Sequence, residues 1–311
     1  MRVRSLLLLS FLALAGAACS MTTMVANNMT GTMDNMKKAF FAESSTKHAL
    51  AAGPAMLMML DGFIEAAPEN VELLQRAAEM NCAFAQTFLD DTDREYAQAM
   101  YAKGLKFAKR AVAVEEPELA KALEAGDEKR VKELLDKTDE DFAPIAFWTG
   151  ICWGGLINSA MEADLATGLP MVERLVARSE AIQPHYFFYA AHIFHAMFYA
   201  GRSAMLGGDL EKGRSHFEKA IEASGGNFLL WKVMFARTYA VNKQDADFFI
   251  RQLQEVLDAP TEDPPDRVLA NQAARDKAEE LLGRVKDFFP DYKVDSGADF
   301  EEEPLESLDL D

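Results

Sequence analysis

The chain has 311 residues, of which half are hydrophobic, and its formal net charge is −18. This length accommodates one large or two ordinary domains, and the apolar half supplies a sizeable core. Because nucleic acids are bound by clustered lysine and arginine, the acidic balance argues against a nucleic-acid partner and against electrostatic binding to anionic membranes.

The first 18 residues have the pattern of a bacterial signal peptide. Arg2 and Arg4 precede an apolar run over residues 6–14, and four small residues follow. The run is about half as long as a helix that spans a bilayer, so we expect the segment to be removed. The next residue, Cys19, resembles the cysteine of a lipobox, although Gly16 stands where leucine is usual. We expect a diacylglyceryl group on Cys19; secretion with a chance cysteine is the alternative.

The expected mature chain is therefore anchored by lipid. Two or three acyl chains hold a protein on a membrane where a single chain does not. Ser20, and not aspartate, follows the cysteine, which predicts a periplasm-facing protein at the outer membrane. We interpret residues 19–35 as the lipidated tether, 36–290 as a helical domain and 291–311 as a disordered acidic tail.

The two remaining cysteines, Cys82 and Cys152, lie in apolar helical contexts. An exported protein can join such residues in a disulfide. Buried free cysteine is also common, and the apolar neighbours favour two free buried thiols here.

Apolar residues with helical spacing recur along the first half of the chain. Met29, Met33, Met36 and Phe40 share one helical face, which we assign to core or subunit packing and not to a copper site. Further helices are predicted over residues 46–67, 71–90 and 93–114, the last one capped by Asp91 or Thr92.

Residues 115–142 are highly charged and have few large apolar side chains. They predict two short solvated helices around a turn at residues 125–127. We expect an exposed excursion here, with an arm that docks a partner as the alternative.

The most apolar helix is predicted over residues 145–163. Its Gly150, Gly154 and Gly155 would each cost about 1 kcal/mol in an ordinary helix interior, so they indicate a close backbone approach. Trp148 and Trp153 flank the helix face that these small residues form. Tight helix packing is the favoured interpretation, and the wall of an apolar cavity is the alternative.

Residues 194–227 match the 34-residue pattern of a tetratricopeptide repeat, which is a pair of antiparallel helices. The small residues of the pattern fall at Gly201, Gly213 and Ala220, and its aromatic residue falls at Phe217. One such hairpin cannot bury both faces, so further helices must stack against it.

The other predicted helices cover residues 169–182, 228–241, 245–257 and 266–289. No strand-like alternation is found. The sequence thus predicts an all-α fold of about twelve helices, stacked as antiparallel hairpins in a tetratricopeptide-like superhelix.

No motif for catalysis or for a nucleotide is present, so nothing argues for an enzyme or a cofactor. His185, His192 and His195 would share a helical face, and their apolar surroundings favour core or cavity-lining residues over a metal site. Lys232, Arg237 and Asp245 lie in or beside an apolar run. They form either a buried ion-pair network or polar anchors in a ligand cavity.

Several segments together resemble the TatT component of TRAP-type (tripartite ATP-independent periplasmic) transporters, a tetratricopeptide-like lipoprotein. The similarity runs from Cys19 to about Phe289. It is carried by Ala39-Phe40, Tyr101-x-x-Gly104-Leu105, Phe147-Trp148 with Trp153-Gly154, Gly207-Gly208-Asp209, Lys232-Val233 with Ala236-Arg237, Glu255-Val256-Leu257 and Leu269-x-Asn271.

This resemblance implies a homotrimer with a pore or cavity through each protomer. It also implies docking of the TRAP-type periplasmic binding subunit and transfer to it of a hydrophobic ligand, with or without a carboxylate. The expected ligand-cavity residues are Trp148, Trp153, Phe187, Tyr189, His192, Lys232 and Arg237. The alternative is a scaffold whose repeats bind a protein partner without a small ligand.

Overall fold

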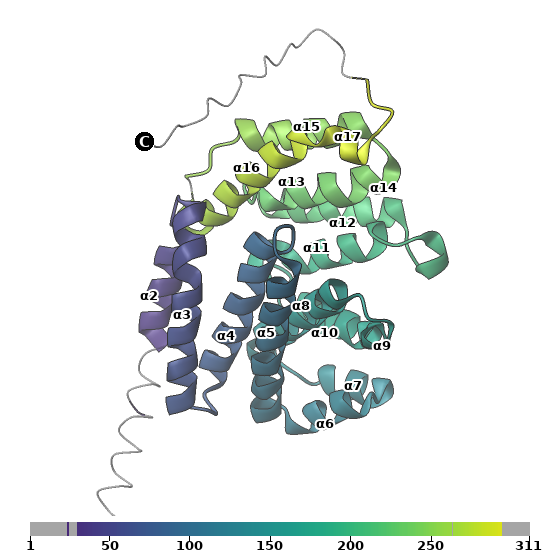
Figure 1. Ribbon diagram of the computed structural model, residues 1–311. Coiled ribbons are helices and arrows are strands. Elements are labelled where there is room, and N and C mark those ends of the chain that lie inside the picture. The colour runs from purple at the N-terminus through teal and green to yellow at the C-terminus, as the bar shows by residue number, and fades with distance from the viewer. Residues whose placement is uncertain (1–23, 25–29, 263, 294–311) are drawn as a thin grey trace, which may run out of the picture.

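The computed structural model describes residues 24, 30–262 and 264–293 (Figure 1). The predicted signal peptide, Cys19, the tether up to residue 29 apart from Met24, and residues 294–311 of the predicted tail lie outside the described residues. The described part consists of helices and connecting turns without a strand, which confirms the all-α prediction.

The N-terminal helices are α2 (Thr30–Phe41), α3 (Thr46–Ala66), α4 (Val71–Phe84) and α5 (Arg94–Glu115). Side-chain caps explain where three of them begin. Ser45, Asn70 and Asp93 accept hydrogen bonds from the backbone N–H groups three residues further on. The predicted cap of α5 at Asp91 or Thr92 was therefore wrong. The predicted helix over 71–90 changes at Phe84 into a π-helical turn, Ala85–Leu89.

The charged segment forms the two predicted short helices, α6 (Pro117–Ala125) and α7 (Glu128–Leu135), on either side of Gly126 at φ 67°. The expectation of an exposed excursion was wrong. Leu119, Val131 and Leu135 are buried, because α6 packs on α5 and α7 packs on α10 (Leu169–Ile182). A few apolar residues at helical spacing suffice to anchor these helices while their charged faces meet water.

Glycines allow the closest approaches between helices in the middle of the molecule. These helices are α8 (Ala143–Ala160), the short α9 (Ala163–Ala166) and α10. A Cβ atom on Gly150 would lie 2.6 Å from Val176 of α10, and one on Gly155 would lie 2.3 Å from the Tyr101 ring of α5. The glycines of α8 therefore serve helix packing.

A disulfide joins Cys82 of α4 to Cys152 of α8, with their Cα atoms 5.5 Å apart. The prediction of two free thiols was wrong. Both helices pack on α5 at Gly104, where a Cβ atom would lie 2.3 Å from the Cys82 sulfur. The missing side chain of Gly104 thus makes room for the bond, and apolar sequence neighbours alone do not reveal this.

The C-terminal helices are α11 (Tyr186–Ala200), α12 (Leu210–Ala223), α13 (Leu230–Phe235), α14 (Val241–Lys243), α15 (Ala246–Asp258), α16 (Val268–Gly283) and α17 (Val285–Phe288). The predicted hairpin is formed by α11 and α12. A Cβ atom on Gly213 would lie 2.6 Å from that of Ala200, and Phe217 stacks on Phe235 of α13 at 4.7 Å. The predicted continuous helix over 228–241 is interrupted by a π-helical turn, Ala236–Ala240.

The two ends of the chain meet along one seam. Helix α16 contacts α2, α3 and the π-helical turn after α4, and Figure 1 shows it crossing the upper end of α3. The seam therefore combines side chains from both the N-terminal and the C-terminal helices.

Candidate functional site

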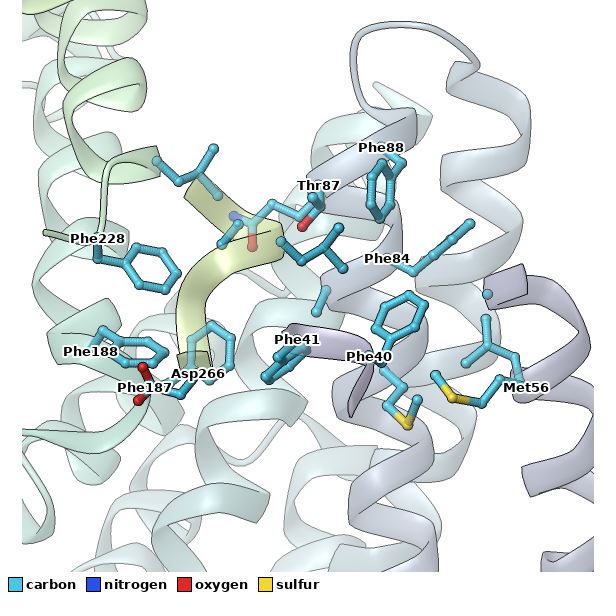
Figure 2. A pocket seen from close by; sticks show the side chains of 18 of the residues that line it. Phe40, Phe41, Met56, Phe84, Thr87, Phe88, Phe187, Phe188, Phe228 and Asp266 are labelled. Atoms are coloured by element: carbon cyan, nitrogen blue, oxygen red, sulfur yellow. The ribbon is translucent and has the colours of Figure 1, made fainter. Parts of the chain in front are cut away.

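An apolar pocket lies in this seam. Its walls come from α2, α3, α4 with its π-helical turn, the start of α11, α13 and α16 (Figure 2). The space free of protein atoms is about 780 Å³, counting open solvent at the mouth. The lining is mainly aromatic and aliphatic: Phe40, Phe41, Met56, Leu57, Met80, Phe84, Phe88, Phe187, Phe188, Phe228, Leu230, Trp231 and Leu269.

On the N-terminal wall, a glycine determines how an aromatic ring lies. Phe84 and Phe88 have ring centroids 5.2 Å apart. A Cβ atom on Gly53 of α3 would lie 2.4 Å from the Phe84 ring. The ring can therefore lie directly on the α3 backbone.

The C-terminal wall contains an unusual backbone turn. Phe187, Phe188 and Tyr189 have φ values of 44°, 56° and 63°. Left-handed backbone costs roughly 1–2 kcal/mol for each residue with a side chain, so other contacts must stabilise it. The Trp231 indole N–H donates to the Phe188 carbonyl at 2.9 Å, and the Phe188 ring stacks on Phe228 at 4.4 Å. The turn places the adjacent rings of Phe187 and Phe188 on the same wall.

Few polar groups reach the pocket. They are Gln86, Thr87 and Asp266. Asp266 forms an ion pair with Arg267 at 2.9 Å, and the Arg267 guanidinium lies 4.6 Å over the Phe188 ring. The charge of Asp266 is thus balanced by Arg267, and the pocket offers mainly apolar contacts.

Among the residues predicted to line a cavity, Phe187 lies in this pocket. Trp148 is buried behind it: its ring meets that of Phe187 edge-on at 5.0 Å, and its N–H donates to the Tyr186 hydroxyl at 2.8 Å. Trp153 lies elsewhere, against Gly168 and beneath the Lys109 ammonium at 4.9 Å. Tyr189 is half-buried in the left-handed turn.

The predicted cationic residues are separate from this pocket. Lys232 forms an ion pair with Glu255 at 2.6 Å, and Arg237 forms one with Asp91. Asp245 caps α15 by accepting the N–H of Phe248. Arg237 and Asp91 instead line a second, polar recess with Asp90, Lys277, Glu280 and Arg284.

His192 belongs to a cluster of three histidines and one glutamate between α10, α11 and α12. Glu180 bridges His192 and His195, at 2.7 and 3.0 Å. The His216 Nδ1 atom lies 3.4 Å from that of His192. The two histidine hydrogen bonds hold the pKa of Glu180 well below its usual range, whereas burial and the neighbouring histidines lower the pKa of His216 to about 4.

Sequence reasoning did not single out Glu180 or His216, because they lie on α10 and α12 and not on the helix that carries His192 and His195. His185 has no part in the cluster's hydrogen bonds. Within the described part of the chain, no three His, Cys, Asp or Glu side chains are placed to hold a metal ion. The cluster therefore connects three helices.

The pocket residues that sequence reasoning missed are mostly aromatic. Phe41, Phe188, Phe228 and Trp231 lie near helix ends. Their signal in the sequence is aromatic enrichment at such ends, which does not show that the ends meet.

Comparison with known proteins gives one family. The model of the TRAP transporter T-component family, TAtT, matches residues 45–289. The matched region begins just before α3 and extends past α17. It therefore includes all of the pocket lining except the residues from α2. No curated protein matches the chain.

Proposed function

The chain belongs to the TRAP transporter T-component family, and from this premise we propose that it holds a hydrophobic ligand in the seam pocket for a TRAP transporter. The family is one of transport accessory components of the bacterial cell envelope. The accessory role would then consist of keeping an apolar molecule out of water while it is held for the transporter.

The observation that carries the proposal is the apolar pocket itself. Phenylalanine rings from α2, α4 and α11 face the same space (Figure 2). Soluble proteins bury such rings unless a ligand or a partner covers them. Ligand pockets have this composition, with a mainly apolar lining and a small number of polar groups that set orientation.

The remaining parts of the proposal rest on family membership and on the sequence. We propose a lipid anchor at Cys19, a position at the outer membrane facing the periplasm, docking of the periplasmic binding subunit, and a homotrimer. Docking beside the mouth of the pocket would allow transfer without exposing the ligand to water.

A pocket-filling variant tests the ligand proposal. Ala270 lines the pocket from α16 and is only partly buried, so Ala270→Phe should fill the space with little disturbance of the core. We expect the variant to bind the neutral apolar dye N-phenyl-1-naphthylamine at least tenfold more weakly in a fluorescence titration.

The matched control is Ala223→Phe, which adds the same ring at an exposed position at the end of α12. It should bind the dye as the parent protein does. Equal affinity of the parent and of Ala270→Phe would contradict the pocket. A parent protein that binds no dye but binds the periplasmic subunit would favour the scaffold without a small ligand.

A further inference from the structure

Helix α3 has two apolar faces, of which only one is covered. Its inward face is formed by Ala49, Gly53, Leu57, Leu60 and Ile64, which are buried. The helix is long and apolar enough to cross a membrane, yet only 28% of its most apolar stretch is buried. An amphipathic helix of a soluble domain would carry polar residues on its outer face.

The outer face is instead a stripe of exposed apolar residues, which we call the α3 stripe: Ala51, Ala52, Ala55, Met58, Met59 and Gly62. Met58 is 71% exposed. Ala51, Ala55, Met58 and Gly62 are separated by four, three and four residues, which is the spacing of a coiled-coil seam. Such a seam fits another helix.

The charges at the two ends of the α3 stripe indicate which helix packs on it. Lys47 and Glu65 are exposed, and neither forms an ion pair within the described part of the chain. They differ by 18 residues, or about five turns, and so lie along the same line of the helix. One end of the stripe is therefore basic and the other acidic.

We propose that the α3 stripe packs on the α3 stripe of a second copy, antiparallel and around a two-fold axis between Ala55 and Met58. In this arrangement each Met58 side chain lies opposite the small Ala55 of the other copy, and Ala51 lies opposite Gly62. Each Lys47 meets the Glu65 of the other copy. The same face is complementary to itself in both size and charge, as a two-fold contact requires.

The composition of the stripe fits a helix better than a lipid surface. Helices that lie on a membrane carry tryptophan or phenylalanine flanked by several basic residues, and the stripe carries alanine, glycine and methionine. This inference does not depend on the ligand proposed for the pocket, although Met56 and Leu57 of α3 line that pocket.

Sedimentation equilibrium of the mature chain with Cys19→Ser tests the contact. We expect an even number of protomers: two, or six if the proposed trimer also forms. Met58→Glu should raise the dissociation constant of the two-fold contact about a hundredfold or more, because two carboxylates would be placed in an apolar seam. Met205→Glu is the control, since Met205 is 96% exposed and lies outside α3.

A charge reversal supplies the sharper test. Lys47→Glu or Glu65→Lys alone should weaken association about tenfold through two repulsive pairs. The double variant should restore it, because each pair is then reversed.

Three results would overturn the inference. The first is a monomer, or a trimer that is indifferent to Met58→Glu. The second is a monomer that binds phosphatidylcholine vesicles in a Met58-dependent way, which would assign the stripe to a lipid surface. The third is failure of the double charge reversal to restore association while both single variants weaken it. None of these results would bear on dye binding in the pocket.

Discussion

At the scale of single residues, packing in this protein depends on glycines that touch neighbouring side chains. Gly155→Ala would place a methyl group 2.3 Å from the Tyr101 ring. We expect the free energy of unfolding to fall by about 1–3 kcal/mol, the usual cost of overpacking, as measured by urea denaturation.

Gly283→Ala is the matched control, because nothing lies within 4 Å of a Cβ atom at that position. Its effect should stay below about 1 kcal/mol. Equal effects of the two substitutions would show that α8 and α5 are not in close contact at Gly155.

The lowered pKa of His216 predicts a loss of stability in acid. Its pKa of about 4 in the folded protein lies below the ordinary value of 6.5. The unfolded chain therefore binds more protons between pH 6.5 and pH 4, and stability falls as the pH falls through this window. The acid loss linked to Glu180 has the same sign, because its pKa in the folded protein is held below the ordinary value of 4.5. It begins at a lower pH than the loss linked to His216, as the pH falls below 4.5.

His216→Gln should remove the part of this acid loss that belongs to His216. The measurement is the difference in unfolding free energy between parent and variant from pH 7 to pH 4, in which contributions from unchanged groups largely cancel. The unfolding free energy of the variant should rise relative to that of the parent as the pH falls below 6.5. A constant difference across the range would contradict the account of His216.

At the scale of elements, the left-handed turn at the start of α11 reverses the usual preference between alanine and glycine. In an ordinary helix, glycine is less stable than alanine by about 1 kcal/mol. At Tyr189, with φ 63°, the penalty of about 1–2 kcal/mol for left-handed backbone falls on alanine and not on glycine. We expect Tyr189→Gly to be more stable than Tyr189→Ala in thermal unfolding; the opposite order would mean a right-handed turn.

The disulfide between α4 and α8 closes a loop across 70 residues of sequence. The chain-entropy model assigns a loop of this length about 4 kcal/mol of stabilisation. Replacing both cysteines by alanine should lower the unfolding free energy by roughly that amount. The form with Cys19→Ser retains only Cys82 and Cys152, so two reactive thiols per chain after denaturation without reductant would contradict the bond.

The sequence predicted those elements that depend on interactions between residues close together in the chain. Helix periodicity, the α11–α12 hairpin and the charged turn at Gly126 follow from local patterns, and they were predicted. The cap at Asp93 differs from the predicted one because three neighbouring residues, Asp91, Thr92 and Asp93, are all good caps. The π-helical turns and the left-handed turn depend on tertiary packing and carry no comparable local signal.

At the scale of the whole molecule, the pocket is a product of the seam between the two ends of the chain. Phe187 was predicted for a cavity together with the ligand role that the family resemblance implies. Phe40 was predicted only as an apolar face residue, since nothing local shows that α2 and α11 line one pocket across the seam. The family resemblance was confirmed over residues 45–289, whereas the cavity assigned to Trp153, Lys232 and Arg237 stays a prediction.

The most direct test of the central claim is native mass spectrometry of residues 20–311, secreted to the periplasm and purified without added ligand. We predict small adducts on each protomer that organic extraction removes as apolar molecules, and their loss in Ala270→Phe but not in Ala223→Phe. A protein without adducts, or adducts that persist unchanged in Ala270→Phe, would contradict the claim that the seam pocket holds a hydrophobic ligand.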